Sequence, residues 1–296
     1  MTLWPRIADA IAQVVQRSVT LRPPRAIGGG CINESFLATE SHSDERYFIK
    51  INRAEHADMF AAEAEGLTEL RRAHALVVPA PITFGVADDN AYLVLEYLDF
   101  GSGRTADAAQ FGTGLAALHR TQRSKFGWHR NNTIGTTPQI NDWNHDWVEF
   151  WRQHRLGFQL QLAAEHGAPQ TLLSRGRSLM DKLAALFIGY TPQASLLHGD
   201  LWSGNYRTLT DCRTAIFDPA VYFGDREADI AMTELFGGFA PGFYAAYNTA
   251  YPLHPDYAKR KTLYNLYHIL NHYNLFGGGY LGQAARMIDD LLKSIG

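Results

Sequence analysis

Two neighbouring polar segments constrain this chain more than any other feature of its sequence. Residues 198–205 read His-Gly-Asp-Leu-Trp-Ser-Gly-Asn, and residues 215–219 read Ala-Ile-Phe-Asp-Pro. Asp, Asn and Gly favour turns, so a turn explains Asp200, Asn205 or Asp218 when each is taken singly. The three together, with His198 before them, instead indicate loops and a short strand that build one site of fixed geometry.

The spacing of these residues is typical of phosphoryl transfer. Asp200 and Asn205 are five positions apart, as are the catalytic Asp and the metal-binding Asn in the kinase pattern His-Arg-Asp-Leu-x-x-x-Asn. A carboxylate can accept the proton of a hydroxyl, and a carboxamide and a second carboxylate offer Mg²⁺ hard oxygen ligands. We therefore predict that Asp200 is the catalytic base, that Asn205 and Asp218 bind magnesium, and that the cofactors are ATP and Mg²⁺.

A lysine within an apolar strand gives independent support. Lys50 lies in the run Phe48-Ile49-Lys50-Ile51, where a buried cation needs an anionic partner. The helical pattern that starts near residue 56 offers Glu63 and Glu65, and kinases pair such a lysine with a helix glutamate and with the nucleotide phosphates. We predict that Lys50 and Glu63 bind the nucleotide. The alternatives are a surface lysine on an edge strand and a glutamate on a solvated helix face.

Two other segments are predicted to contact the nucleotide. Gly28, Gly29 and Gly30 can bring backbone amides close to phosphate oxygens, although a triple glycine is also a flexible turn. Glu96 and Leu98 end a strand before a linker, where topology alone predicts that the backbone faces adenine.

The apolar periodicity divides the chain into a small β-rich part and a larger helical part. The first part is predicted to hold helices over 4–17 and 56–75, a hairpin over 35–38 and 47–51, and a strand pair over 82–86 and 92–96. The second is predicted to hold helices near 105–120, 143–166, 172–188, 226–236, 255–274 and 281–294. We predict a two-lobed α+β fold, with an N-terminal lobe at 1–97, a hinge at 98–103 and a helical C-terminal lobe at 104–296.

The composition argues against several other classes of protein. The 296 residues carry a net charge of −3, so no large positive field is available to attract nucleic acid or an anionic membrane. The two cysteines form neither a disulfide framework nor a zinc pattern, and Cys31 is either a redox-sensitive thiol or a small apolar residue. Because we find no signal-peptide pattern and no long apolar run, we expect a cytoplasmic protein. We also expect a monomer or a weak dimer.

Several blocks of the sequence resemble the fructosamine kinase family (the ketosamine-3-kinases), whose relatives are the aminoglycoside and choline phosphotransferases. The matching blocks are Gly-Gly-Gly-Cys-Ile-Asn at 28–33, Met-Phe-x-x-Glu-Ala-x-Gly-Leu at 59–67, Phe-Trp-x-x-x-Arg-Leu at 150–156, the segment 198–205, Asp-Pro-Ala-Val-Tyr at 218–222 and the block at 226–239. The resemblance implies a protein-kinase-like fold. It also implies ATP-dependent phosphorylation of the C3 hydroxyl of a ketosamine, the sugar adduct of an amine, to an unstable product that reverses glycation.

The residues themselves leave the phosphoryl acceptor open. Trp202 offers an aromatic face that suits a sugar or a cation, and we predict that it binds the substrate, a small-molecule or protein-bound ketosamine. A kinase of the same fold could instead act on an aminoglycoside, choline or another hydroxyl compound. A third alternative is a catalytically silent nucleotide-binding module, which the intact set of Lys50, Asp200, Asn205 and Asp218 disfavours.

Overall fold

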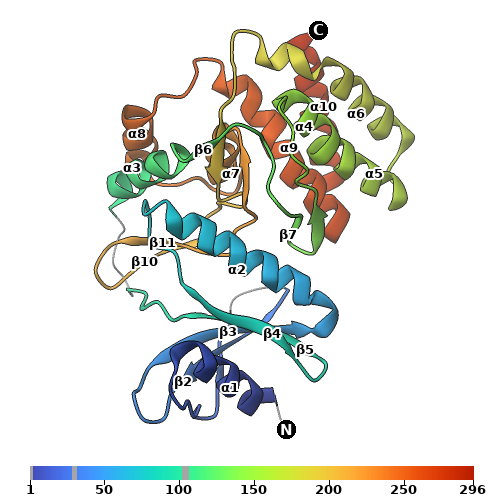
Figure 1. Cartoon of the computed structure of the whole chain (residues 1–296). Coiled ribbons are helices and arrows are strands. Elements are labelled where there is room, and N and C mark those ends of the chain that lie inside the picture. The colour runs from blue at the N-terminus through green and yellow to red at the C-terminus, as the bar shows by residue number, and fades with distance from the viewer. Residues whose placement is uncertain (1–2, 29–31, 102–106) are drawn as a thin grey trace. The chain divides into compact units, whose positions relative to one another are not determined.

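The computed structural model describes residues 3–28, 32–101 and 107–296, and the chain forms two compact units (Figure 1). The first unit comprises Met1–Ala106 and Arg207–Asp218, and the second comprises Asp107–Tyr206 and Pro219–Gly296. Residues 207–218 therefore belong with the first unit, although the sequence analysis placed them in the C-terminal lobe. The predicted hinge at 98–103 ends outside the described residues.

An antiparallel sheet of five strands forms the centre of the first unit. Its order is β1-β2-β3-β5-β4, and the strands are β1 (Arg25–Ala26), β2 (Glu34–Thr39), β3 (Arg46–Arg53), β4 (Pro81–Ala87) and β5 (Asn90–Glu96). Strands β2 and β3 pair in an antiparallel register, as do β4 and β5. The predicted hairpin and the predicted strand pair are thus confirmed. β-Branched and aromatic residues, which favour a pleated and half-buried surface, make up half of β3.

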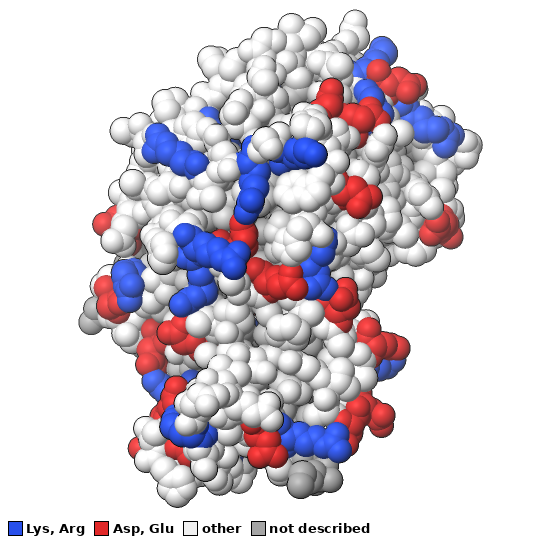
Figure 2. Space-filling model, in the orientation of Figure 1, with Lys and Arg blue, Asp and Glu red and all other residues white. Residues whose placement is uncertain are grey.

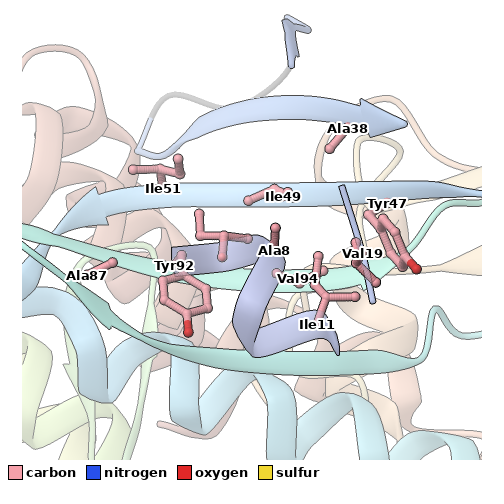
Figure 3. Close-up of a cluster of buried hydrophobic side chains, with 11 residues drawn as sticks. Ala8, Ile11, Val19, Ala38, Tyr47, Ile49, Ile51, Ala87, Tyr92 and Val94 are labelled. Carbon is pink, nitrogen blue, oxygen red and sulfur yellow. The ribbon is translucent and has the colours of Figure 1, made fainter. Parts of the chain in front are cut away.

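Two helices, α1 (Leu3–Val15) and α2 (Ala57–Arg72), cover opposite faces of this sheet (Figure 1); the short 3₁₀ turn η1 (Ala54–His56) precedes α2. Successive side chains of a strand point to opposite faces. Ile49 and Ile51 of β3 therefore pack with Ile11 of α1 in a buried hydrophobic cluster (Figure 3), while Lys50 between them faces α2. Each fully buried isoleucine stabilises the fold by about 1.5–3 kcal/mol, which holds the register that directs Lys50.

A strand pair from late in the sequence completes the first unit. Strand β10 (Tyr206–Thr208) pairs with β11 (Thr214–Ile216). The amide of Gly101 donates to the carbonyl of Thr208 at 2.9 Å, and the amide of Ile216 donates to the carbonyl of Val77 at 2.9 Å. These backbone bonds tie residues 207–218 to the first unit. Their partners lie far away in the sequence, so no local pattern predicts them.

Helices make up most of the second unit. They are α3 (Ala108–His119), α4 (Trp147–Trp151), α5 (Phe158–Glu165), α6 (Gln170–Lys182), α7 (Glu227–Leu235), α8 (Pro241–Ala250), α9 (Tyr257–Phe276) and α10 (Tyr280–Ile295). Each predicted helical segment contains a helix, but the one expected over 143–166 is interrupted by the π-helical segment η2 (Arg152–Gly157), and the 3₁₀ turn η3 (Leu183–Phe187) follows α6. Helix α8 was not predicted, because it starts at a Pro-Gly pair and contains aromatic and Asn residues of low helix propensity.

Short strands in the second unit lead to the polar segment at 198–205. Strand β9 (Ala194–Leu197) lies between β6 (Gln122–Arg123) and β12 (Tyr222–Gly224), and β7 (Asn132–Ile134) pairs with β8 (Thr137–Gln139). All four residues of β9 are buried, so this strand is a rigid approach to His198. The other four strands have two or three residues each, too few to show an alternating pattern in the sequence.

The surface carries charges of both signs. On the face in Figure 2, Lys and Arg side chains lie among Asp and Glu side chains. Exposed ion pairs such as Arg6 with Asp88 at 3.0 Å contribute at most about 1 kcal/mol each. Within the ranges that the structure describes, no helix is both long and apolar enough to cross a lipid bilayer.

A buried histidine of α9 predicts how stability depends on pH. Burial, with the nearby charge of His272, lowers the pKa of His268 from its ordinary 6.5 to about 3. The unfolded chain therefore binds a proton between these values that the folded chain does not, so the free energy of unfolding falls as pH falls below about 6.5. We expect His268 to account for a loss of about 2 kcal/mol between pH 7 and pH 5.

Urea unfolding of the wild type and of His268→Leu at both pH values measures this effect. The variant should lose about 2 kcal/mol less than the wild type over this interval, whatever its stability at pH 7. An equal loss in the two proteins would show that folding does not lower the pKa of His268.

Candidate active site

A buried cluster of one cation and two carboxylates lies in the first unit. The Nζ atom of Lys50 donates to Oε1 of Glu63 at 2.6 Å and to Oδ1 of Asp218 at 2.7 Å. Lys50 comes from β3, Glu63 from the face of α2 that covers the sheet, and Asp218 from the chain that follows β11. The structure thus brings together three residues that the sequence analysis singled out.

The two carboxylates keep Lys50 charged. Burial alone would lower the pKa of Lys50, but the negative charges of Asp218 and Glu63 outweigh burial and raise it above its ordinary value. Asp218 has φ of +56°, a left-handed conformation that non-glycine residues adopt at a cost. Backbone strain of this kind is common at functional sites, and the carboxylate of Asp218 is half-exposed.

The other predicted nucleotide-binding positions are only partly described. Gly28 is exposed, whereas Gly29, Gly30 and Cys31 lie outside the described residues. Glu96 ends β5 and is exposed; its amide donates to the carbonyl of Ala80 at 2.8 Å, and its carboxylate accepts from the amide of Ala80 at 3.0 Å. Leu98 follows as a half-buried residue.

The loop that follows β9 in the second unit is held by backbone contacts. Gly199 has φ of +82°, and a Cβ atom there would lie 2.0 Å from the carbonyl oxygen of Ala220, so only glycine fits. The amide of Ala220 donates to the carbonyl of His198 at 2.9 Å. The amide of Asp200 donates to Nδ1 of the buried His198 ring at 3.3 Å. This close packing fixes the backbone that leads into Asp200.

Asp200 and Asn205 are in direct contact. The Nδ2 atom of Asn205 donates to the backbone carbonyl of Asp200 at 2.8 Å and to its Oδ2 atom at 3.0 Å. This contact turns Oδ1 of the buried Asn205 side chain away from Asp200. The carboxamide oxygen of Asn205 is a hard donor, so it suits a magnesium ion better than a soft metal.

A buried carboxylate that the sequence analysis did not identify anchors this loop. Asp229 of α7 accepts hydrogen bonds from the amides of His198 at 2.7 Å and Gly199 at 2.9 Å. Its Oδ2 atom also lies 3.2 Å from Nε2 of His119, the last residue of α3. Burial alone would raise the pKa of Asp229, but the hydrogen bonds from His119 and from the Gly199 amide, with His198 close by, lower it, so the carboxylate stays ionised.

A chain of buried polar groups continues from Asp229. Burial lowers the pKa of His119, and the neutral ring donates from Nε2 because a carboxylate can only accept. Nδ1 then accepts from the hydroxyl of Tyr247 at 2.8 Å, whose oxygen accepts from Arg226 at 3.0 Å. The sequence signal for these contacts lies in the block at 226–239, where Glu227 and Asp229 closely follow Arg226. The spacing of these residues does not show which side chains they contact.

Trp202 lies against the loop backbone beside Asp200. Its indole ring is 38% exposed and packs over Gly204, where a Cβ atom would lie 2.2 Å from the ring. The ring can occupy this position only because Gly204 has no side chain. An exposed aromatic face of this kind can bind a sugar or an amine.

The two units carry different chemistry. In the first unit, Lys50 with its carboxylates can bind phosphate oxygens and a hard cation. In the second unit, Asp200 can accept a hydroxyl proton, and its loop is preorganised by Asp229.

Comparisons with known proteins agree along nearly the whole chain. The family model of fructosamine kinase matches residues 3–294. A Synechocystis protein assigned as a ketoamine kinase is 44% identical over 293 residues, which are 98% of this chain and 97% of that protein. The chloroplastic protein-ribulosamine 3-kinase of Arabidopsis thaliana is 41% identical over 274 residues, which are 91% of this chain and 82% of that protein.

Solved structures also match this chain over nearly its whole length. The crystal structure of a Haemophilus somnus protein assigned as a fructosamine-3-kinase has a TM-score of 0.88 at 30% identity and covers 98% of this chain and 100% of that chain. A choline kinase of Streptococcus pneumoniae has a TM-score of 0.61 at 16% identity, covers 98% of each chain and shows the fold alone. The predicted α+β, protein-kinase-like fold, with a β-rich N-terminal lobe and a larger helical C-terminal lobe, is confirmed.

The packing of Trp202 on Gly204 can be tested directly. In Gly204→Ala the new methyl group overlaps the indole ring, so the ring must move. We expect one indole N–H resonance, identified as that of Trp202 by its loss in Trp202→Phe, to shift in the NMR spectrum of the variant. Gly242→Ala is the matched control, because a Cβ atom there would lie 3.6 Å from its nearest neighbour. An unshifted Trp202 signal in Gly204→Ala would contradict the described packing.

Proposed function

The chain belongs to the fructosamine kinase family and is an ATP-dependent phosphotransferase that acts on a hydroxyl, and we propose that its acceptor is the C3 hydroxyl of a ketosamine. The observation that carries this proposal is the family match over residues 3–294, together with relatives named ketoamine kinase and ribulosamine 3-kinase. Ketosamines form when sugars glycate amines. Because the C3 phosphate of such an adduct is unstable, the proposed activity reverses early glycation.

In the proposed reaction, the C3 oxygen bonds to the γ-phosphorus of ATP while the bond from that phosphorus to the β–γ bridging oxygen breaks, which releases ADP. We assign to Asp200 the role of orienting the hydroxyl and accepting its proton. The support is local: Asn205 holds the carboxylate, and Asp229 holds the backbone of the loop. A base fixed in this way needs little reorganisation during the reaction.

We assign nucleotide binding to residues of the first unit. A charged Lys50, kept in place by Glu63 at 2.6 Å, suits the α- and β-phosphates. The amides of Gly28, Gly29 and Gly30 are proposed to lie over the phosphates. The backbone at Glu96 and Leu98 is proposed to bind adenine, since Glu96 ends β5 and Leu98 lies just beyond that strand.

We assign magnesium binding to Asn205 and Asp218. Both offer hard oxygen donors, and Mg²⁺ commonly keeps water and phosphate oxygens as its remaining ligands, so two protein ligands suffice. When bound, the ion neutralises charge that develops on the transferred phosphoryl group.

The substrate is proposed to be a small or protein-bound ketosamine that contacts Trp202. A cytoplasmic location and a monomeric or weakly dimeric state stay predictions. So does the absence of nucleic-acid and membrane partners, for which the mixed surface charge (Figure 2) is the support.

ADP release measured with four acceptors tests the proposed substrate class. We expect turnover with ribulosyl-lysine or fructosyl-lysine and none with an aminoglycoside or choline. Asp200→Asn, run in parallel, should lose about a hundred-fold to ten-thousand-fold in kcat while its thermal shift with MgATP changes little. Turnover of the other acceptors alone would contradict the ketosamine assignment, and kcat within a few-fold of wild type in Asp200→Asn would contradict the role of this carboxylate.

The role of Glu63 predicts a defect in the use of ATP. Glu63→Gln removes one of the two negative charges that hold Lys50, so kcat/KM for MgATP should fall about ten-fold to a hundred-fold. The control is Glu55→Gln, which neutralises an exposed acid in η1, just before the same helix, and it should change nothing. If Glu63→Gln keeps wild-type kcat/KM for MgATP, the salt bridge is structural and does not serve the nucleotide.

A further inference from the structure

A row of aromatic side chains starts at Trp202 in the second unit. The ring centroid of Trp202 lies 6.2 Å from that of Phe236, which lies 5.2 Å from that of His272. The ring of His272 lies 5.7 Å from Phe276 and 5.1 Å from Tyr280. We call these five residues the aromatic row. It connects the loop of Asp200 with the segment after α7, the end of α9 and the start of α10.

The aromatic row is open to solvent at both ends. Trp202 is 38% exposed and Phe276 is 62% exposed, while the other three residues of the row are half-buried. Exposed large apolar residues that touch one another commonly mark a binding surface, whereas scattered single ones do not. Within the described part of the second unit, no arginine lies over any of these five rings.

The chemistry of the row suits an uncharged hydrocarbon chain or an aromatic or aliphatic side chain. Phosphate groups need cations or backbone amides, and those of the proposed nucleotide site, Lys50 and the glycine run, belong to the first unit. The row instead begins two positions after Asp200, the residue assigned to the acceptor hydroxyl. Its place on the loop of Asp200 therefore favours the acceptor as the bound group.

We propose that the aromatic row binds the amine-derived part of the acceptor, namely the side-chain methylenes of a glycated lysine and an apolar residue next to it in a polypeptide. This inference rests on the proposed function. The sugar of a ketosamine carries the reacting hydroxyl and must lie at Asp200, so its amine substituent continues away from that residue. Trp202 faces the sugar-amine junction, and the other four rings of the row contact the rest of the amine substituent. The row thus makes peptide-borne ketosamines the preferred substrates.

The experiment compares two substrates in the full-length protein. One is a peptide with ribulosyl-lysine next to leucine. The other is ribulosyl-methylamine, whose amine carries only a methyl group and which therefore lacks the part proposed to contact the row. In the wild type, kcat/KM should be higher for the peptide. In Phe276→Ala, the ratio of kcat/KM for the peptide to kcat/KM for the small substrate should fall about five-fold to ten-fold, mainly through KM of the peptide. Ile188→Ala, which truncates an apolar side chain of the second unit that is 79% exposed, should leave the ratio at the wild-type value.

The possible results separate the two proposals. A ratio that Phe276→Ala leaves unchanged, with ketosamine turnover intact, overturns the aromatic row as a subsite but keeps the proposed function. Turnover of neither ketosamine by the wild type overturns both. If size-exclusion chromatography shows that Phe276→Ala changes the oligomeric state, the row is an interface with a second copy of the chain, and the subsite proposal fails.

Discussion

A lysine buried in a sheet has to be paired with carboxylates, and the first unit is built around this requirement. The alternation of β3 directs Lys50 toward α2 and the isoleucines on either side toward α1. The helix then supplies Glu63, and the late strand pair β10–β11 brings Asp218 into the same unit. An isolated buried ammonium would lose its proton. The two carboxylates prevent this and leave a permanent positive charge at a defined place.

The second unit keeps the buried carboxylate of Asp229 charged by means of hydrogen bonds. Asp229 is buried, yet it stays ionised because two backbone amides and the ring of His119 donate to it. The two amide bonds also restrain the loop that carries Asp200. Charge-assisted hydrogen bonds of this kind are worth about 1.5–3 kcal/mol each, so displacing the loop breaks both of them at once. The position of Asp200 therefore depends on a residue that takes no proton itself.

The sequence predicted those parts of the structure that depend on local periodicity or on spacing along the chain. Lys50 and Glu63 belong to this class, because strand alternation and helix phase each show in a short window. The anchoring by Asp229 does not, since its partners His119 and His198 come from distant segments, and neither does the membership of residues 207–218 in the first unit. The π-helical segment η2 within the helix expected over 143–166 also has no periodic signal. Long-range contacts explain why the anchoring by Asp229 and the membership of residues 207–218 in the first unit could not be predicted.

The two units use different interactions, and this difference bears on specificity. The charged cluster at Lys50 can recognise phosphate and a metal, groups that every ATP-dependent transfer shares. The proposed aromatic row would instead recognise shape and apolar area, and each added contact is worth only about 1–3 kcal/mol. A row of several rings can therefore discriminate between acceptors in small steps without disturbing the base or the nucleotide. In such an arrangement, a change in acceptor preference requires changes in the aromatic side chains of α9 and α10, while β3 and α2 stay as they are.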